Sequence, residues 1–287
     1  IATWIGGSGN WTNTANWLDA FAPVTGVEVE YAGTNGTSRN DSTVGAIGAL
    51  TFSNNSTGSF TIAGGNLSIG SAGIANNSSY TNTVALNLTL GANQIFAANT
   101  GNLVVTGNIS GSGALTKTGS QTLVLSGNNT YTGGTTVSAG TVVGTTNSLQ
   151  GLILNNAIVN FDQSTNGTYA GSMSGSGALL KSGSATLSLA ANNTYTGGTT
   201  ISAGTLAVST GSSISHSAAT LAVGAGTGDN GTLTINGGSV SNALGTIGRD
   251  AGSTGLVSLS SGNWTNTALR IGDSGNGTLN LTGGNVI

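Results

Sequence analysis

Apolar and polar residues alternate in many short runs along this chain. Clear runs are LVV at 103–105, TLVLS at 122–126, TLSLA at 186–190 and GTLTI at 231–235. In each run the apolar side chains stand two positions apart, which is the period of a β-strand with one buried face. Glycine-rich turns interrupt the chain too often for any segment of helical length and period. The pattern therefore predicts an all-β fold.

The chain also repeats itself. Residues 111–142 read GSGALTKTGSQTLVLSGNNTYTGGTTVSAGTV, and residues 175–206 match them at 24 of 32 positions without a gap. A second, shorter repeat is built around Val/Ile-Gly pairs that recur at a constant spacing, at Gly224, Gly248 and Gly272. Self-similarity on this scale indicates a solenoid, in which each unit buries its apolar face against its neighbours.

The period favours a parallel β-helix over a propeller. Propeller blades repeat every ~40–50 residues and must resemble one another throughout the chain. Here the 64-residue offset of the long repeat divides into three similar coils, and the later 24-residue repeat is one coil by itself. We therefore predict a parallel β-helix, or β-solenoid, of about a dozen coils of 21–24 residues, with the turn motif NNTYTGG at 128–134 and 192–198.

Changes in composition suggest four segments. They are an aromatic-rich cap with the first coil (1–45), early coils (46–110), two long repeats (111–210) and 24-residue coils (211–287). GTLNLTGGNV at 277–286 matches GTLTINGGSV at 231–240 in six of ten positions, so the given sequence stops within a copy of the repeat. Because an open solenoid end exposes a β-edge, we expect the native polypeptide to continue beyond residue 287.

Aromatic residues supply the candidate contacts for a ligand or for another molecule. Three of the four tryptophans, Trp4, Trp11 and Trp17, lie near the start, and Tyr131 and Tyr195 lie in the two NNTYTGG motifs. One interpretation of the tryptophans is a buried cluster that caps the first coil, because an uncapped end would template aggregation. The alternative is an exposed platform for sugar rings, and exposed tyrosines would serve the same purpose. The cap is the favoured interpretation.

Charge and cysteine content exclude several classes of function. Only 5% of residues are charged, the net charge is −3, and no basic cluster is present, which argues against nucleic-acid binding. No apolar stretch approaches the ~20 residues of a membrane-spanning helix. The absence of cysteine excludes disulfides and thiolate metal sites. The surface must instead be covered by Ser, Thr, Asn and Gly.

No constellation of residues indicates catalysis. Glu28 and Glu30 share one strand face, and Asp162 is isolated in a loop, so neither pattern resembles the paired carboxylates of a glycosidase. The single histidine, His216, has no nearby serine and carboxylate pattern and is expected at the surface or in a turn. We therefore expect no enzyme activity and no cofactor, and a polysaccharide-acting enzyme is the least favoured alternative.

Two further sets of equivalent residues have a structural and a functional interpretation. Asp229, Asp250 and Asp273 follow the glycines of the 24-residue repeat, where stacked acids could bind Ca²⁺, but Arg249 lies between them, and a solvated turn face with no metal is favoured. Lys117 and Lys181 occupy equivalent positions. Their stems should pack along the solenoid with the ammonium groups at a turn, the alternative being a Lys–Asn isopeptide crosslink.

The sequence at 111–144 resembles the autotransporter-associated β-strand repeat, also called the passenger-associated transport repeat. The positions that fall on its usual pattern, each with a partner in the second copy, are Gly111, Gly113, Leu115, Lys117, Gly119, Leu123, Leu125, Tyr131, Gly134, Thr136, Val137 and Gly140. Residues 221–287 resemble the repeat shared by autotransporter passengers and PEP-CTERM-sorted surface proteins, and TWIGGSGNWTNTANW resembles the start of such passengers. The resemblance implies a bacterial, exported, right-handed β-helix and no particular activity.

These observations favour an extracellular, non-enzymatic β-solenoid at the bacterial cell surface. Its expected role is mechanical, as a stalk or a fibre or filament subunit that associates end to end or laterally with its own copies. The alternative is an autotransporter-type adhesin passenger that binds glycans or neighbouring cells.

Overall fold

The computed structural model describes residues 1–287, and almost all of the regular structure is β-strand. The helices are two short 3-10 turns, η1 (Thr14–Asn16) and η2 (Leu18–Ala20), and neither is long enough to reach across a membrane. The chain divides into two compact units. Unit 1 comprises Ile1–Val143 and Asn147–Gly151, and unit 2 comprises Gly144–Thr146 and Leu152–Ile287. The division falls inside the segment 111–210, between its two long repeats.

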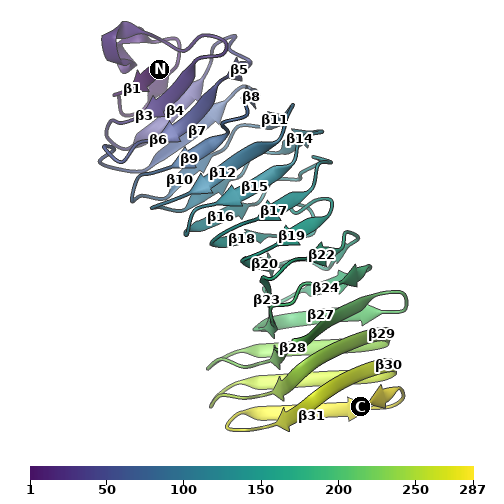
Figure 1. The fold of residues 1–287 in the computed structure, drawn as a ribbon. Helices are drawn as coiled ribbons and strands as arrows, with labels where there is room; N and C mark the ends of the chain where they lie inside the picture. The colour runs from purple at the N-terminus through teal and green to yellow at the C-terminus, as the bar shows by residue number, and fades with distance from the viewer. The chain divides into compact units, whose positions relative to one another are not determined.

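Unit 1 is a stack of parallel strands in three columns, drawn from purple to teal in Figure 1. The first column contains β1 (Ala2–Trp4), β3 (Glu28–Tyr31), β6 (Ala49–Phe52), β9 (Ile74–Asn76), β12 (Gln94–Ala98), β15 (Leu115–Thr118) and β17 (Thr135–Val137). The second contains β2 (Gly9–Asn10), β4 (Gly36–Asn40), β7 (Phe60–Gly64), β10 (Asn82–Val84), β13 (Leu103–Val105), β16 (Thr122–Leu125) and β18 (Thr141–Gly144). The third contains β5 (Ala46–Ile47), β8 (Leu67–Ile69), β11 (Leu88–Leu90) and β14 (Ile109–Gly111).

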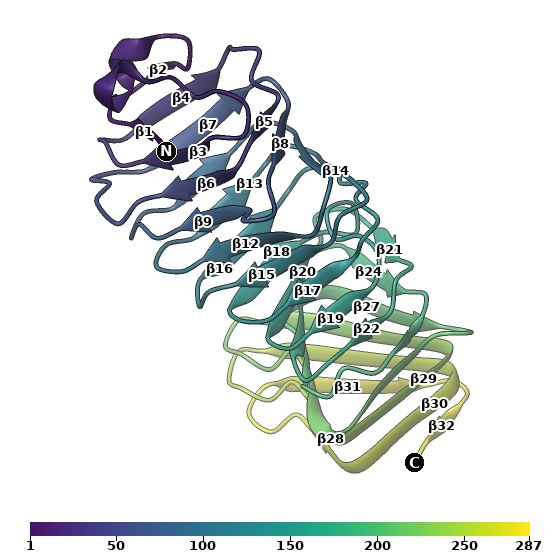
Figure 2. The same ribbon diagram turned by 45° about the horizontal axis from the view of Figure 1, so that its top comes forward.

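Unit 2 is built in the same way (Figure 2). One column contains β20 (Ile158–Asp162), β23 (Ala178–Ser182), β26 (Thr199–Ile201), the end of β28 (Ser213–Val223) and, beyond it, the ends of β29 (Asn230–Ile247) and β30 (Thr254–Ile271). A second contains β21 (Gly167–Tyr169), β24 (Thr186–Leu189), β27 (Ala203–Ser209), the starts of β29 and β30, and β31 (Asn276–Leu281). A third contains β25 (Asn192–Asn193), the start of β28, the middle of β29 and β30, and β32 (Asn285–Val286), while β19 (Ile153–Asn155) pairs with β22 (Met173–Ser174).

Strand pairing gives the length of each coil, meaning one turn of the solenoid. A 20-residue coil separates Leu115 from its partner Thr135, and a 24-residue coil separates Leu50 from its partner Ile74. Unit 1 stacks seven coils and unit 2 stacks six, each strand lying parallel to its neighbours. The predicted all-β solenoid of about a dozen coils is therefore confirmed. Some coils are shorter than the expected 21–24 residues and others longer, as between Ala2 and its partner Val29, which are 27 residues apart.

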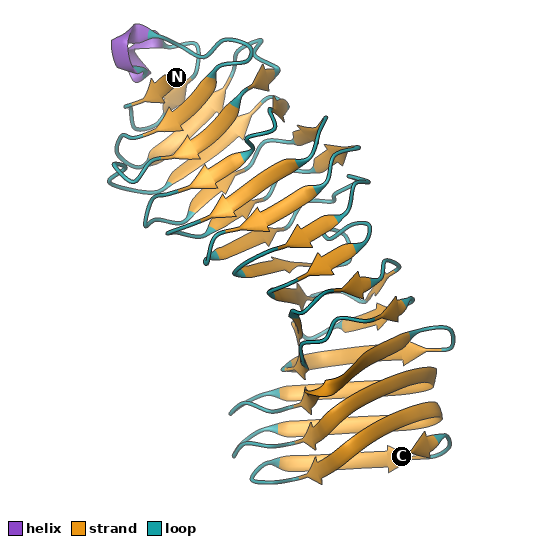
Figure 3. Cartoon of the chain, in the orientation of Figure 1, coloured by secondary structure: helices purple, strands orange, loops and turns teal.

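The alternating pattern explains which side chains form the core. In β16, Leu123 and Leu125 are buried while Thr122 and Val124 are partly exposed on the outer face. Stacking of equivalent strands places Leu123 beside Leu103 of the preceding coil, so each coil covers the apolar face of the next. In unit 2, β29 and β30 are each a single long strand that passes around a corner of the coil (Figure 3). The core of each unit is therefore a stack of mostly Leu, Ile and Val side chains, into which buried aromatic rings are inserted.

Candidate functional site

Three of the sequence-predicted contacts, Trp4, Trp11 and Trp17, lie inside unit 1. Their side chains are at most 2% exposed, and the Trp4 and Trp17 rings meet edge to face with centroids 4.9 Å apart. Trp11 Nε1 donates to Ser38 Oγ (2.8 Å) and lies 3.0 Å from the Tyr31 hydroxyl. Edge-to-face packing and a satisfied indole N–H are typical of a buried aromatic cluster. The cap interpretation is thus supported, and an exposed platform for sugar rings is wrong for these three side chains.

Tyr131 and Tyr195 are also buried, at 2% and 0% exposure, so the prediction that they are exposed contacts is wrong. The Tyr131 hydroxyl lies 2.7 Å from Thr135 Oγ1, and the Tyr195 hydroxyl lies 2.6 Å from Thr199 Oγ1. Each ring packs in the core, and each hydroxyl is hydrogen-bonded to the threonine four residues later in the chain. This hydrogen bond offsets the cost of burying the hydroxyl group. Burial raises the pKa of both phenols.

The two lysines form the most distinctive polar sites of the molecule. Lys117, at 0% exposure, points into unit 1, and its Nζ donates to the carbonyl oxygens of Thr118 (2.8 Å), Gly119 (2.7 Å) and Ala139 (3.0 Å). An ammonium group has three N–H donors and no acceptor. All three donors of Lys117 are therefore satisfied by backbone at a turn, without a carboxylate.

Lys181 repeats this arrangement in unit 2. Its Nζ donates to the carbonyls of Ser182 (2.5 Å), Gly183 (2.7 Å) and Ala203 (3.0 Å). Burial lowers the pKa of both lysines to about 8, and Asp162 raises the pKa of Lys181 slightly. The three carbonyl acceptors around each Nζ nevertheless fit the ammonium form, which has three N–H donors. The ammonium groups lie at a turn as predicted, but the prediction that the stems pack along the outside of the solenoid is wrong, because both side chains point inward and are fully buried. Every polar partner of these groups is a backbone carbonyl.

Asparagine side chains of the NNTYTGG motifs bridge successive coils. Asn129 Oδ1 accepts from the Ile109 N–H (2.8 Å) of the preceding coil, and its Nδ2 donates to the Ser148 carbonyl (2.7 Å). Asn193 makes the same bonds, from the Met173 N–H (3.0 Å) and to the Ser213 carbonyl (3.1 Å). The first motif is irregular backbone rather than the predicted turn, and the second begins with the short strand β25. Sequence reasoning missed these bridges, and the one-coil spacing of their partners is the signal that could have found them.

His216 is buried in unit 2 at 1% exposure, so the prediction of a surface or turn histidine is wrong. Its Nε2 lies 2.9 Å from Thr199 Oγ1, and its ring centroid lies 5.7 Å from that of Tyr195. Burial lowers the pKa of this imidazole, and nearby backbone groups of His216 and Ala219 partly oppose that effect without forming a hydrogen bond of normal geometry. It points inward because it continues the strand alternation of Ile214 in β28.

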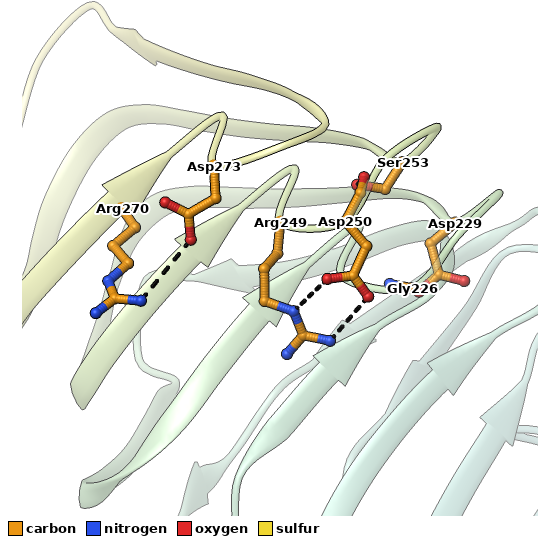
Figure 4. Close-up of polar contacts among 7 residues, drawn as sticks. All are labelled: Gly226, Asp229, Arg249, Asp250, Ser253, Arg270 and Asp273. Carbon is orange, nitrogen blue, oxygen red and sulfur yellow. Dashed lines mark hydrogen bonds and ion pairs between the residues drawn. The ribbon is translucent and has the colours of Figure 1, made fainter.

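The acidic turns of the 24-residue coils carry ion pairs (Figure 4). Asp229 Oδ2 accepts from the Gly226 N–H within its own turn (2.8 Å). Arg249 Nε lies 2.8 Å from Asp250 Oδ1, and Arg270 Nη1 lies 3.9 Å from Asp273 Oδ2. The arginine pairing lowers the pKa of Asp250. Each carboxylate thus has its own partner, and no three histidine or acidic side chains are gathered in one place.

The remaining acids are also apart from one another. Glu28 and Glu30 alternate with buried Val29 and Tyr31 in β3, so both face outward from one strand, as predicted. Asp162 is exposed, and one of its oxygens accepts from Ser182 Oγ (3.1 Å). These side chains are arranged for hydration rather than opposed across a cleft.

One hollow lies on the outer surface of unit 2, with a volume of about 280 Å³. It is open to solvent, and its lining consists of Ser184, Ala203, Gly204, Thr205, Asn230 and Thr232. Small residues leave the space, and hydroxyl, amide and backbone groups surround it. The lining is therefore about equally polar and apolar, and none of its side chains is charged.

Comparison with known proteins gives one family. The family model of the passenger-associated-transport-repeat matches residues 115–143 and residues 179–208. No curated protein and no solved structure matches the chain. The two matched segments contain the buried lysines, the bridging asparagines and the tyrosine–threonine pairs described above. The family model therefore matches one segment in each compact unit, where the sequence resemblance placed the two copies.

Proposed function

We propose that this chain is an extracellular structural β-solenoid of a bacterial cell surface, a stalk or fibre subunit that associates with its own copies and has no enzymatic activity. The observation that carries the proposal is the distribution of charge. Between residues 42 and 228 the only charged side chains are Lys117, Asp162 and Lys181, and both lysines are buried. Asp162 is thus the one exposed charged side chain in this long segment.

An almost uncharged surface has two physical consequences. Copies of the chain do not repel one another strongly, and contacts between neutral Ser, Thr and Asn side chains are little affected by ionic strength. The ladder of backbone hydrogen bonds along each unit supplies cohesion without any ligand or metal. Repeats of the passenger-associated type support an exported location for such a domain.

Cryo-electron microscopy and sedimentation velocity of the purified protein test the proposal. We expect fibres or lateral assemblies that persist at both low and high salt. A double variant, Thr232→Lys with Thr234→Lys, adds two charges to the partly exposed outer face of β29, and the matched control replaces both residues by serine. Lateral assembly should weaken in the lysine variant only. Separate particles at every concentration and salt condition would contradict a polymer-forming role.

The hollow on unit 2 favours a second candidate, glycan binding by an adhesin passenger. Its hydroxyl and amide lining offers neutral donors and acceptors of the kind that sugar hydroxyl groups use. A screen against neutral oligosaccharides tests it, with Thr205→Glu as the blocking variant. Retention of a glycan by the wild type and loss of it in the variant would move the function from assembly to adhesion.

A further inference from the structure

A relay of three side chains is buried in unit 2, where the second repeat meets the coil that follows it. The Tyr195 hydroxyl lies 2.6 Å from Thr199 Oγ1, which in turn lies 2.9 Å from His216 Nε2. All three side chains are at most 1% exposed. His216 Nδ1, by contrast, has no hydrogen-bond partner. The relay therefore ends on a buried, unsatisfied ring nitrogen.

The hydrogen bonds of the relay fit only one charge state of the His216 imidazole. With neutral imidazole, the Tyr195 O–H donates to Thr199, the Thr199 O–H donates to Nε2, and only Nδ1–H lacks an acceptor. Protonation adds a hydrogen to Nε2, which must then donate to Thr199 Oγ1. That oxygen can accept from both Nε2–H and the Tyr195 O–H, so the Thr199 O–H, which had donated to Nε2, loses its acceptor, while Nδ1–H remains unsatisfied and the ring is charged. The geometry thus fits the neutral histidine and penalises the imidazolium.

No opposite charge is available to compensate. Tyr195 is the titratable group that faces the ring from the preceding coil, and the β26 partner is the neutral Thr199. On the other side His216 is paired with Asn242 of β29, whose amide is engaged by Trp264 and Asn266 of the next coil. The buried charge of the same unit is the ammonium of Lys181, on the strand that pairs with β26, and it has the same sign. An imidazolium here would be unpaired, which is costly in a low-dielectric interior.

The backbone next to His216 offers a route for the ring to leave. Pairing of β28 with β29 changes register between His216 and Thr220, where residues 217–219 stand opposite the single residue Ala243. Ser217 and Ala218 are exposed. A bulge of this kind interrupts the hydrogen-bond ladder locally, so His216 can swing outward at a modest cost in backbone bonds.

We propose that His216 makes the junction between the second repeat and the following coil acid-sensitive: protonation expels the imidazole from the core and locally opens residues 213–223. The charged form is disfavoured only in the folded state, because the free side chain has an ordinary pKa of 6.5. The junction therefore has its full stability above pH 6.5 and loses it as the pH falls toward the lowered folded-state pKa. In that window the opening equilibrium should rise about tenfold for each pH unit.

The first repeat provides an internal control. Tyr131 and Thr135 make the same pair, but the third partner is the backbone N–H of Gln150, 3.4 Å from the Tyr131 hydroxyl. A backbone amide does not titrate in this range. Acid should therefore loosen the second repeat and leave the first unchanged.

Hydrogen exchange followed by mass spectrometry between pH 7.5 and pH 5, corrected for intrinsic exchange rates, tests the proposal on the whole chain. We expect peptides that cover residues 195–223 to lose protection as the pH falls, and peptides that cover 131–150 to keep it. In His216→Gln the pH dependence should disappear, because glutamine can bond Thr199 and does not titrate. Equal losses in both repeats, or the same loss in His216→Gln, would overturn the proposal.

A second measurement uses only the wild-type protein and so does not depend on whether the variant folds. His216 is the only histidine of the chain, so its imidazole signals in an NMR titration of the wild type are unambiguous. The expected result is a midpoint below 6.5, accompanied by exchange broadening of the neighbouring Ile214 and Leu221 methyl groups. A midpoint at or above that value, or titration with no change at those methyls, would show that His216 does not control the junction.

Discussion

The two passenger-associated-transport-repeats form one structural motif placed in two surroundings. Both bury a lysine on three carbonyls, both bridge to the preceding coil through an asparagine, and both pair a tyrosine with a threonine. Only the third partner of the hydroxyl pair differs, being the Gln150 N–H in unit 1 and the His216 ring in unit 2. The same residues thus give a pH-independent contact in one place and a titratable one in the other.

The positions at which the repeats differ are also informative. The two repeats differ at eight of their 32 aligned positions. Two of these, Val137/Ile201 and Val142/Leu206, are buried and change only in size. Most of the others point outward, as at Val124/Ser188, where both side chains are partly exposed. Buried polar groups tolerate less change than buried apolar ones, since a lost hydrogen-bond partner costs more than a small difference in volume. The motif is therefore held by its polar contacts and its glycines.

The largest expected effect comes from the glycine that follows each lysine site. Gly140 and Gly204 have φ of +67° and +63°, and an added Cβ would clash with the carbonyl oxygen of Gln121 or of Gly183, respectively. Both the left-handed backbone and the clash with rigid backbone oppose alanine. Gly140→Ala and Gly204→Ala should each reduce the free energy of unfolding by about 3 kcal/mol or more in urea titrations.

Matched controls separate the clash from the backbone conformation. Gly26 in unit 1 and Gly211 in unit 2 each have φ of +83°, but a Cβ at either position would meet nothing within 4 Å. Alanine there should cost only about 1 kcal/mol. If all four variants lost the same free energy, close packing of successive coils would not be the reason for glycine in the repeats.

The buried lysines give the next largest effect. Methionine has a similar length but donates no hydrogen bond, so Lys117→Met and Lys181→Met would leave three carbonyls without their ammonium partner. Relief of the buried charge offsets part of that loss, and we expect roughly 2 kcal/mol of destabilisation in each case. Chemical denaturation measures the total, and hydrogen exchange shows whether each loss stays in its own unit.

The two lysine variants should lose nearly the same free energy of unfolding, because each ammonium has three equivalent carbonyl partners at closely similar distances. A much smaller cost in either variant than in the other would mean that its carbonyls are hydrated once the ammonium is gone.

Strand period and repeat length were sufficient to predict the solenoid. Alternation in β16 identifies Leu123 and Leu125 as inward, and the spacing of the repeats gives coil lengths close to the observed ones. Residue type and turn motif alone favour a surface position for Tyr131, Tyr195 and His216, whereas all three side chains are buried. The partners that make their burial possible, such as Thr199 for His216, lie in the neighbouring coil and become visible only when the coils are stacked.

The smallest expected effect separates the two hydroxyl pairs. In Tyr131→Phe the Thr135 hydroxyl loses its side-chain partner, whereas in Tyr195→Phe the Thr199 hydroxyl still reaches His216. Loss of one buried hydrogen bond is worth about 1 kcal/mol. Tyr131→Phe should therefore cost about 1 kcal/mol or slightly more in thermal or urea unfolding at pH 7.5, and Tyr195→Phe should cost less.

The control is the variant His216→Leu, which removes the remaining partner of Thr199. In that background, adding Tyr195→Phe should cost nearly as much free energy of unfolding as Tyr131→Phe costs in unit 1. Equal costs for the two single variants would show that the histidine does not support Thr199, and the two repeats would then be energetically the same.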